Sequence, residues 1–199
     1  MRQLTFIVAF FTLGASGILM SWPQSGQKSP KEVVEEFCKF ETAGGRLTTD
    51  GWNKAERFFA SSSPTPKTKT ILVTAKDYYV RDAIFRSEDR ADVVIEMTGS
   101  IWKLDSRMGL SLSSPDQLES FLSYPVIRIK SNSESGRGAD ASHDVSGSPE
   151  WKIEGAGANI WLTADTAVKY VTQIRAHTSD PVVKQNAEKT LIRLKQLLH

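Results

Sequence analysis

The sequence predicts an α+β domain, in which a curved antiparallel sheet of about four to six strands packs on N-terminal helices and two extra C-terminal helices follow. Three observations predict this class. Apolar residues recur at helical spacing from residue 29 to 59, alternate at strand spacing across 71–162, and return to helical spacing in 163–199. The 199 residues fit one domain with a small appendage. We therefore expect one domain over residues 29–162 and a C-terminal helical extension.

The first segment has the layout of a signal peptide. Arg2 precedes an uncharged apolar run over residues 4–13, and small residues follow. We predict that residues 1–25 contain a signal peptide that is cleaved on export to a periplasmic or extracellular location, so that the mature chain begins within residues 18–25. The alternative is an uncleaved N-terminal membrane anchor, because the uncharged stretch is long enough to approach a bilayer span. An intact mass of the exported protein that still includes Met1 would contradict cleavage.

Two helices are predicted next. Ser29 is a capping residue, Pro30 suits the first helical position, and Glu32 completes a capping box. A second, shorter helix is expected with Thr49 or Asp50 as its cap. The residues expected to face inward from this helical hairpin are Val33, Val34, Phe37, Cys38 and Phe40, and then Trp52, Ala55, Phe58 and Phe59.

The middle of the chain alternates as strands do. Residues 71–85 and 91–104 read as strands joined by a turn at 87–90, and the "YPVIRIKS" and "EWKIEG" segments read as a further hairpin. The polar residues 131–149 between the last two strands are expected to form a flexible loop. A short helix is expected over 114–123.

The segment "EWKIEGAGANIWLT" raises the question of a phosphate-binding glycine loop. A dinucleotide fingerprint needs a third glycine where Ile160 stands, and a helix directly after the loop. Neither is present. We expect Gly155 and Gly157 to lie on the inward face of one long final strand and to let it bend. Beyond it, Thr163 and Asp180 are expected to begin the two C-terminal helices.

The order of these elements resembles the nuclear transport factor 2-like superfamily of cone-shaped, cystatin-like α+β domains. The resemblance covers residues 29–162 and is carried by "LTTDGWNKAERFF" and "PEWKIEG", which look like the second helix and final strand of small exported members. The resemblance implies a pocket between the sheet and the helices. Some members of the superfamily are isomerases or dehydratases that use Asp, His or Tyr in this pocket. The C-terminal helices and the long loop depart from the usual pattern.

Several classes of function are excluded by composition and spacing. The formal charge of +2 is too small and too evenly spread for a nucleic-acid partner. Three histidines and one cysteine, Cys38, lack any metal-ligand spacing. The sequence has no nucleophile elbow and no cofactor motif. We therefore expect no metal and no cofactor, and we expect membrane contact only if the N-terminal segment is uncleaved.

The candidate site residues are few. Asp77 shares strand parity with Val73 and Tyr79, so its carboxylate is expected to point inward, where Tyr78 or Tyr79 would assist it in acid/base chemistry. Trp102 has the opposite parity and is expected on an exposed or partner-facing patch. The aromatic residues that are candidates for lining a ligand pocket are Trp52, Phe58, Tyr79, Trp151 and Trp161.

Three hypotheses of function follow. The first is an exported non-catalytic domain that binds a small apolar ligand or a protein partner, with a homodimer as one form of partnership. The second is a pocket enzyme of the isomerase, dehydratase or hydrolase type that uses Asp77 with Tyr78 or Tyr79. The third is a membrane-tethered interaction module. The direction of the Asp77 carboxylate, toward a cavity or toward bulk water, separates the second from the first.

Overall fold

The computed structural model describes residues 27–61, 71–99, 101–105, 111–113, 121–131, 147–155 and 159–199. The predicted leader, most of the predicted loop at 131–149 and Gly157 lie outside the described residues. The helices are α1 (Pro30–Thr42), η1 (Gly45–Leu47), α2 (Thr49–Ala55), η2 (Glu56–Phe58), α3 (Ala164–His177) and α4 (Pro181–Leu197). The strands are β1 (Ile71–Ala75), β2 (Asp77–Ser87), β3 (Arg90–Thr98), β4 (Trp102–Asp105), β5 (Ser111–Ser113), β6 (Phe121–Ser131), β7 (Gly147–Ile153) and β8 (Asn159–Thr163).

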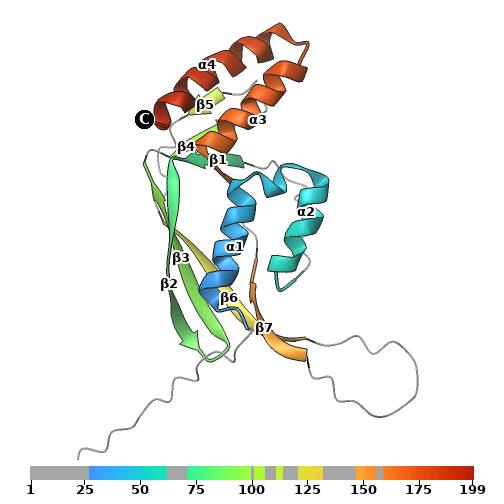
Figure 1. The fold of residues 1–199 in the computed structure, drawn as a ribbon, viewed down its shortest axis with the longest axis vertical. Coiled ribbons are helices and arrows are strands. Elements are labelled where there is room, and N and C mark those ends of the chain that lie inside the picture. The colour runs from blue at the N-terminus through green and yellow to red at the C-terminus, as the bar shows by residue number, and fades with distance from the viewer. Residues whose placement is uncertain are drawn as a thin grey trace, which may run out of the picture.

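The α+β class is confirmed, and the strands form two sheets of four (Figure 1). The long sheet has the strand order β2-β3-β6-β7 and is antiparallel throughout. The short sheet has the order β5-β4-β1-β8, and its β1 and β8 run parallel. The expected single curved sheet is therefore divided, with the long sheet packed on α1 and the short sheet next to α3 and α4 (Figure 1).

The helices begin where local signals place them. The Ser29 hydroxyl accepts a hydrogen bond from the Glu32 N–H at 3.3 Å, and the Glu32 carboxylate accepts one from the Ser29 N–H at 2.6 Å. Thr163 and Asp180 cap α3 and α4 as predicted. The cap of α2 is Thr48 and not Thr49 or Asp50, because the Thr48 hydroxyl is the one that accepts from Gly51 N–H, at 3.1 Å.

Two hydrophobic clusters hold the two sheets. The first joins α1 and the segment after α2 to one face of the long sheet, with Phe37, Val93 and Ile153 fully buried. The second joins the short sheet to α3 and α4 and contains Leu72 and Leu194. Strand β1 contributes to both clusters, since its neighbouring residues point to opposite faces. The short sheet is therefore buried on both sides at β1.

One expected strand is broken at Lys76. The chain bends there, so β1 belongs to the short sheet and β2 to the long one. The side-chain alternation does not continue across the bend, and Asp77 and Tyr79 are exposed, Tyr79 by 55%. The expectation that Asp77 shares the inward face with Val73 is therefore wrong.

The segment "EWKIEGAGANIWLT" is also divided between the sheets. Its Trp151 and Ile153 face inward on β7 as predicted, but the strand ends there, and β8 pairs with β1 in the other sheet. Gly155 is exposed and has no atom within 4 Å of the position of a Cβ. The prediction of a single bent strand with Gly155 inward is therefore wrong, because the glycine lies in a crossing between sheets.

The helix expected over residues 114–123 is wrong at residues 121–123. Residues 114–120 lie outside the described residues, while Phe121, Leu122 and Ser123 belong to β6, where they pair with β3. Leu122 and Tyr124 face α1 and Phe121 faces away from it, which is strand periodicity. Within the described part of the chain, none of the helices combines the length and apolar character needed to cross a bilayer.

Candidate functional site

A buried ion pair joins the end of α1 to η1. Glu41 and Arg46 are each 1% exposed. The Arg46 Nε donates to Glu41 Oε2 at 2.7 Å, and its Nη2 donates to Oε1, so the carboxylate is held by two parallel hydrogen bonds. Gly44 makes this return possible, because its φ of +90° reverses the chain directly after α1, in a conformation that L side chains rarely adopt.

The same pair completes the edge of the short sheet. The Arg46 Nη2 donates to the carbonyl of Asn159 at 2.7 Å, and Glu41 Oε1 accepts from the N–H of Trp161 at 3.2 Å. These are the carbonyl of one β8 residue and the N–H of the residue two further on, which a neighbouring parallel strand would engage. The ion pair therefore takes the place of a missing strand beside β8.

Aromatic rings surround the guanidinium. The Arg46 Cζ lies 4.6 Å from the centroid of the Trp52 ring and 5.5 Å from that of Phe37. Such rings stabilise a cation that has lost its water. The charge of Arg46 is thus balanced by Glu41 and by two rings, which explains how it lies in a core.

A small cavity lies beside this pair. It measures about 10 Å³, which is room for one water molecule. Pockets for small ligands commonly measure about 300–1,000 Å³. The cavity therefore has no space for a small apolar ligand. Its lining residues are Cys38, Glu41, Thr42, Tyr78, Ile95, Met97, Tyr124 and Trp161.

The titratable groups of the cavity are held in unreactive states. Burial raises the pKa of the Cys38 thiol and of the Tyr124 hydroxyl far above neutral pH, so both keep their protons. Burial also raises the pKa of the Glu41 carboxyl, and this effect is opposed by Arg46 and by the Trp161 N–H. The Tyr78 pKa is raised by burial as well. The cavity has neither an activated nucleophile nor an unengaged base.

The predicted catalytic residues do not converge there. Asp77 is exposed and its Oδ1 accepts a hydrogen bond from the Tyr78 N–H at 2.8 Å. Tyr79 is exposed, and only the half-buried Tyr78 reaches the cavity. The carboxylate that does line the cavity, Glu41, was missed. One feature of the sequence indicates that Glu41 is buried: it lies four residues after Phe37, on the buried stripe of α1.

The predicted aromatic residues divide into three groups. Trp161 lines the cavity, Tyr79 is exposed, and Trp52, Phe58 and Trp151 are buried in the two cores. Trp102 is half-buried against the α3–α4 cluster, so its expected place on an exposed patch is wrong. Its strand pairs with β1, and the indole packs against the cluster formed by the short sheet with α3 and α4.

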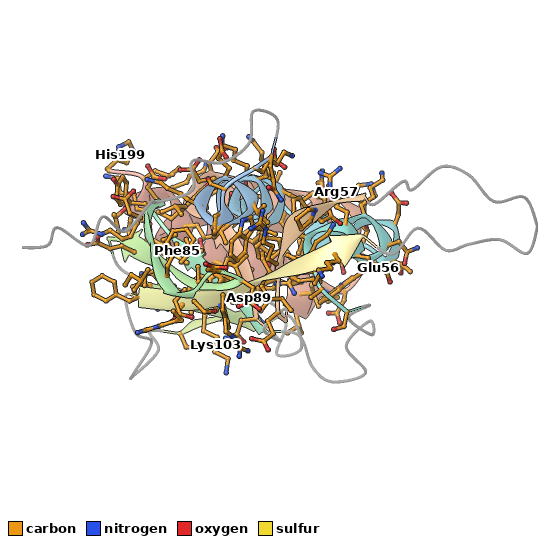
Figure 2. The ribbon with its side chains drawn as sticks, turned by 90° about the horizontal axis from the view of Figure 1, so that it is seen from below. Glu56, Arg57, Phe85, Asp89, Lys103 and His199 are labelled. Carbon is orange, nitrogen blue, oxygen red and sulfur yellow. The ribbon has the colours of Figure 1, made fainter. Side chains whose placement is uncertain are left out.

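The outer face of the long sheet is the second candidate site. We define this outer face as the side opposite α1 (Figure 2), and the register of the strands assigns its members. Directly paired residues point to the same side of a sheet. The rows across the outer face are Asp77 and Thr98; Tyr79, Glu96 and Phe121; Val94 and Ser123; Ile84, Asp92 and Pro125; Ser87, Arg90, Ile127 and Lys152; and Ile129 and Glu150.

This outer face carries several exposed apolar side chains. Tyr79, Ile84 and Phe121 are each more than half exposed, at 55%, 51% and 51%. Val94 is half-buried between the Tyr79 and Ile84 rows, and Ile127 is half-buried one row beyond Ile84. An antiparallel sheet with one solvated face normally places polar residues there. Glu96 and Asp92 lie among these apolar residues, and exposed apolar side chains gathered on one face are typical of a contact surface.

Comparisons with protein-family models, with curated proteins and with solved structures found no match to this chain. In the described part of the chain, no group of three or more His, Cys, Asp or Glu side chains is placed to hold a metal ion. Both candidate sites are therefore defined by their geometry. One is a closed polar cluster, and the other is an open apolar surface.

Proposed function

We propose that the protein is a non-catalytic binding domain whose ligand is another protein, docked on the outer face of the long sheet. The observation that carries this proposal is the exposure of three apolar side chains, Tyr79, Ile84 and Phe121, which the strand register places on the side of the sheet opposite α1. Burial of apolar surface contributes about 25 cal/mol per Å², and it is the main favourable term in protein association.

The pocket alternatives have less support. A cavity of about 10 Å³ holds one water molecule, and a small apolar ligand needs more space. The predicted acid/base reaction needs a carboxylate that faces a cavity, within hydrogen-bond reach of the substrate proton. Asp77 faces solvent, and Glu41 is engaged by Arg46 and Trp161. We therefore favour binding by the sheet over chemistry in the cavity.

The proposed localisation remains export directed by residues 1–25. The proposed relation to the nuclear transport factor 2-like superfamily is supported by α1 and α2 lying before a four-stranded antiparallel sheet that packs on α1. In this proposal the domain meets its partner outside the cytoplasm.

A photo-crosslinking experiment tests the docking surface. Benzoylphenylalanine replaces Phe121 in the producing cells, and the adducts are separated by mass and identified by peptide sequencing. We expect one discrete adduct, because a docked partner lies against this ring. The second substitution Ile84→Glu, in the same chain, is expected to abolish the adduct, since it places a charge in the apolar patch.

The matched control places the same probe at Val182, which is 62% exposed on α4. A site outside the docking surface should give no discrete adduct. Equal adducts at positions 121 and 182, or no adduct at 121, would contradict the proposed function. An adduct at 121 that survives Ile84→Glu would contradict it as well.

A further inference from the structure

We propose that the solvent-exposed side of α4 binds an anionic lipid surface. This basic face consists of Lys184, Glu188, Lys189, Ile192, Arg193 and Lys195, all of which are exposed. It is separate from the proposed protein-docking surface, because α4 packs on α3 and the short sheet, whereas the docking surface belongs to the long sheet (Figure 1). The contact also differs from the membrane anchor considered above, since it does not need residues 1–25.

Positive charge is concentrated in the C-terminal helices. Residues 164–199 contain six Lys or Arg and three Asp or Glu, which gives a formal charge of +3. The whole chain carries +2, so the remaining residues carry −1. Four of the six basic residues lie within residues 184–195 of α4. A cluster of about four to eight Lys or Arg on an amphipathic helix is typical of helices that bind anionic lipid.

The positive charge of the basic face is not neutralised within the described part of the chain. Glu188 is the one acidic member of this face, and it pairs with Arg175 of α3 at 3.0 Å. Lys184, Lys189 and Lys195 form no ion pair with any described residue. Their ammonium groups therefore lie in solvent, where a surface of opposite charge attracts them.

An exposed apolar residue lies at the centre of the basic face. Ile192 is 62% exposed, while Leu191 and Leu194 on the other side of α4 are buried in the second hydrophobic cluster. Lys189 lies three residues before Ile192 and Lys195 three residues after it, so both flank it on one side of the helix. At a lipid surface, an apolar side chain enters the acyl boundary while neighbouring lysines keep their ammonium groups at the phosphates. The pattern around Ile192 fits this arrangement.

The shape of the basic face and the type of its cations favour a lipid surface over an acidic protein. From residue 184 to residue 195 an α-helix rises about 16 Å, so the cations follow one convex ridge that a flat surface contacts along its length. Three of the four cations are lysines, whose compact charge needs no fixed geometry, whereas bidentate recognition of carboxylates favours arginine. The fourth, Arg193, already donates from Nη1 to the Leu112 carbonyl at 3.3 Å.

Co-sedimentation of the purified chain with lipid vesicles tests this inference. The vesicles contain phosphatidylcholine alone, or phosphatidylcholine with about one-third phosphatidylglycerol. We expect binding to the anionic vesicles that weakens as salt is added, because salt screens exposed charges, and little binding to the neutral ones. The triple variant Lys184→Gln, Lys189→Gln and Lys195→Gln is expected to weaken binding on the order of 100-fold, since each lysine near an anionic surface contributes about fivefold.

Ile192→Ser tests the apolar contact separately, because it leaves the charge of α4 unchanged. We expect it to weaken binding to the anionic vesicles by about tenfold, since the isoleucine no longer transfers from water to the acyl boundary. Far-ultraviolet circular dichroism should show an unchanged fold, because Ile192 is exposed. Unchanged vesicle binding by Ile192→Ser would contradict the placement of this residue in the lipid.

The matched control removes the same charge elsewhere, by the triple variant Lys28→Gln, Lys39→Gln and Lys54→Gln at exposed lysines in and beside α1 and α2. It should weaken binding by less than about threefold, because these charges lie away from the lipid contact. Equal effects of the two triple variants, or no binding to anionic vesicles at low salt, would overturn the inference. Binding through residues 1–25 would survive the α4 triple variant, so such survival would overturn it too. Binding to polyglutamate but not to vesicles would assign the basic face to an acidic protein instead.

Discussion

Replacing Arg46 by methionine is expected to lower the free energy of unfolding by about 3–5 kcal/mol, because it leaves the buried Glu41 carboxylate without its cation. The carbonyl of Asn159 loses a donor in the same step. Urea unfolding followed by far-ultraviolet circular dichroism measures the loss. This readout is preferred to fluorescence because the guanidinium lies against the Trp52 ring.

The control for this prediction is a surface ion pair. Lys54 and Asp50 pair at 2.7 Å with side chains that are 64% and 73% exposed, so Lys54→Met should cost less than about 1 kcal/mol. The double variant Glu41→Leu with Arg46→Met should recover part of the loss, since it buries no unpaired charge. About 1–3 kcal/mol should remain, because β8 still lacks partners for Asn159 and Trp161. Equal costs for Arg46→Met and Lys54→Met would contradict the structural role of the pair.

Phe37→Ala is the second large effect, with an expected loss of about 3–5 kcal/mol. The Phe37 ring is fully buried and meets three rings edge-on, those of Phe58 at 5.6 Å, Phe59 at 5.3 Å and Tyr124 at 5.6 Å. It therefore connects α1 to the segment after α2 and to β6. Its removal leaves a cavity that three separate elements would have to close, and the same urea titration measures the cost.

The matched variant is Phe85→Ala. Phe85 is 60% exposed and meets only one ring edge-on among the described residues, that of Trp151 at 6.0 Å. Its loss should cost less than about 1 kcal/mol, as for most surface positions. Phe37→Leu, which keeps most of the apolar volume, should fall between the two. A loss for Phe37→Ala no larger than that for Phe85→Ala would show that the α1 contact is not central to the core.

The helices could be predicted because their signals are local. The capping box of Ser29 and Glu32 operates within one turn, and the caps at Thr163 and Asp180 likewise need only their own helix. The strands could be predicted from alternation, including Trp151 and Ile153 facing inward. Alternation does not carry information on which sheet a strand joins, so the breaks at Lys76 and after Ile153 were not predicted.

The candidate sites were less predictable than the fold. Sequence parity selected Asp77, which the bend at Lys76 turns to solvent, and it passed over Glu41 because a carboxylate is normally a surface residue. Glu41 is buried only because Arg46 returns to it through the turn at Gly44. The outer face likewise depends on register, since Tyr79 and Phe121 share a row only when β2, β3 and β6 are aligned.

The sequence by itself determined the α+β class, the helix starts and the buried stripes, because each depends on residues within a few positions of one another. Only the tertiary structure decided the division into two sheets, the burial of the Glu41–Arg46 pair and the apolar outer face. The physical reason is that these features join residues from 5 to more than 100 positions apart, such as Glu41 and Trp161. Their energies arise from contacts that exist only after the two cores have closed around α1 and β1.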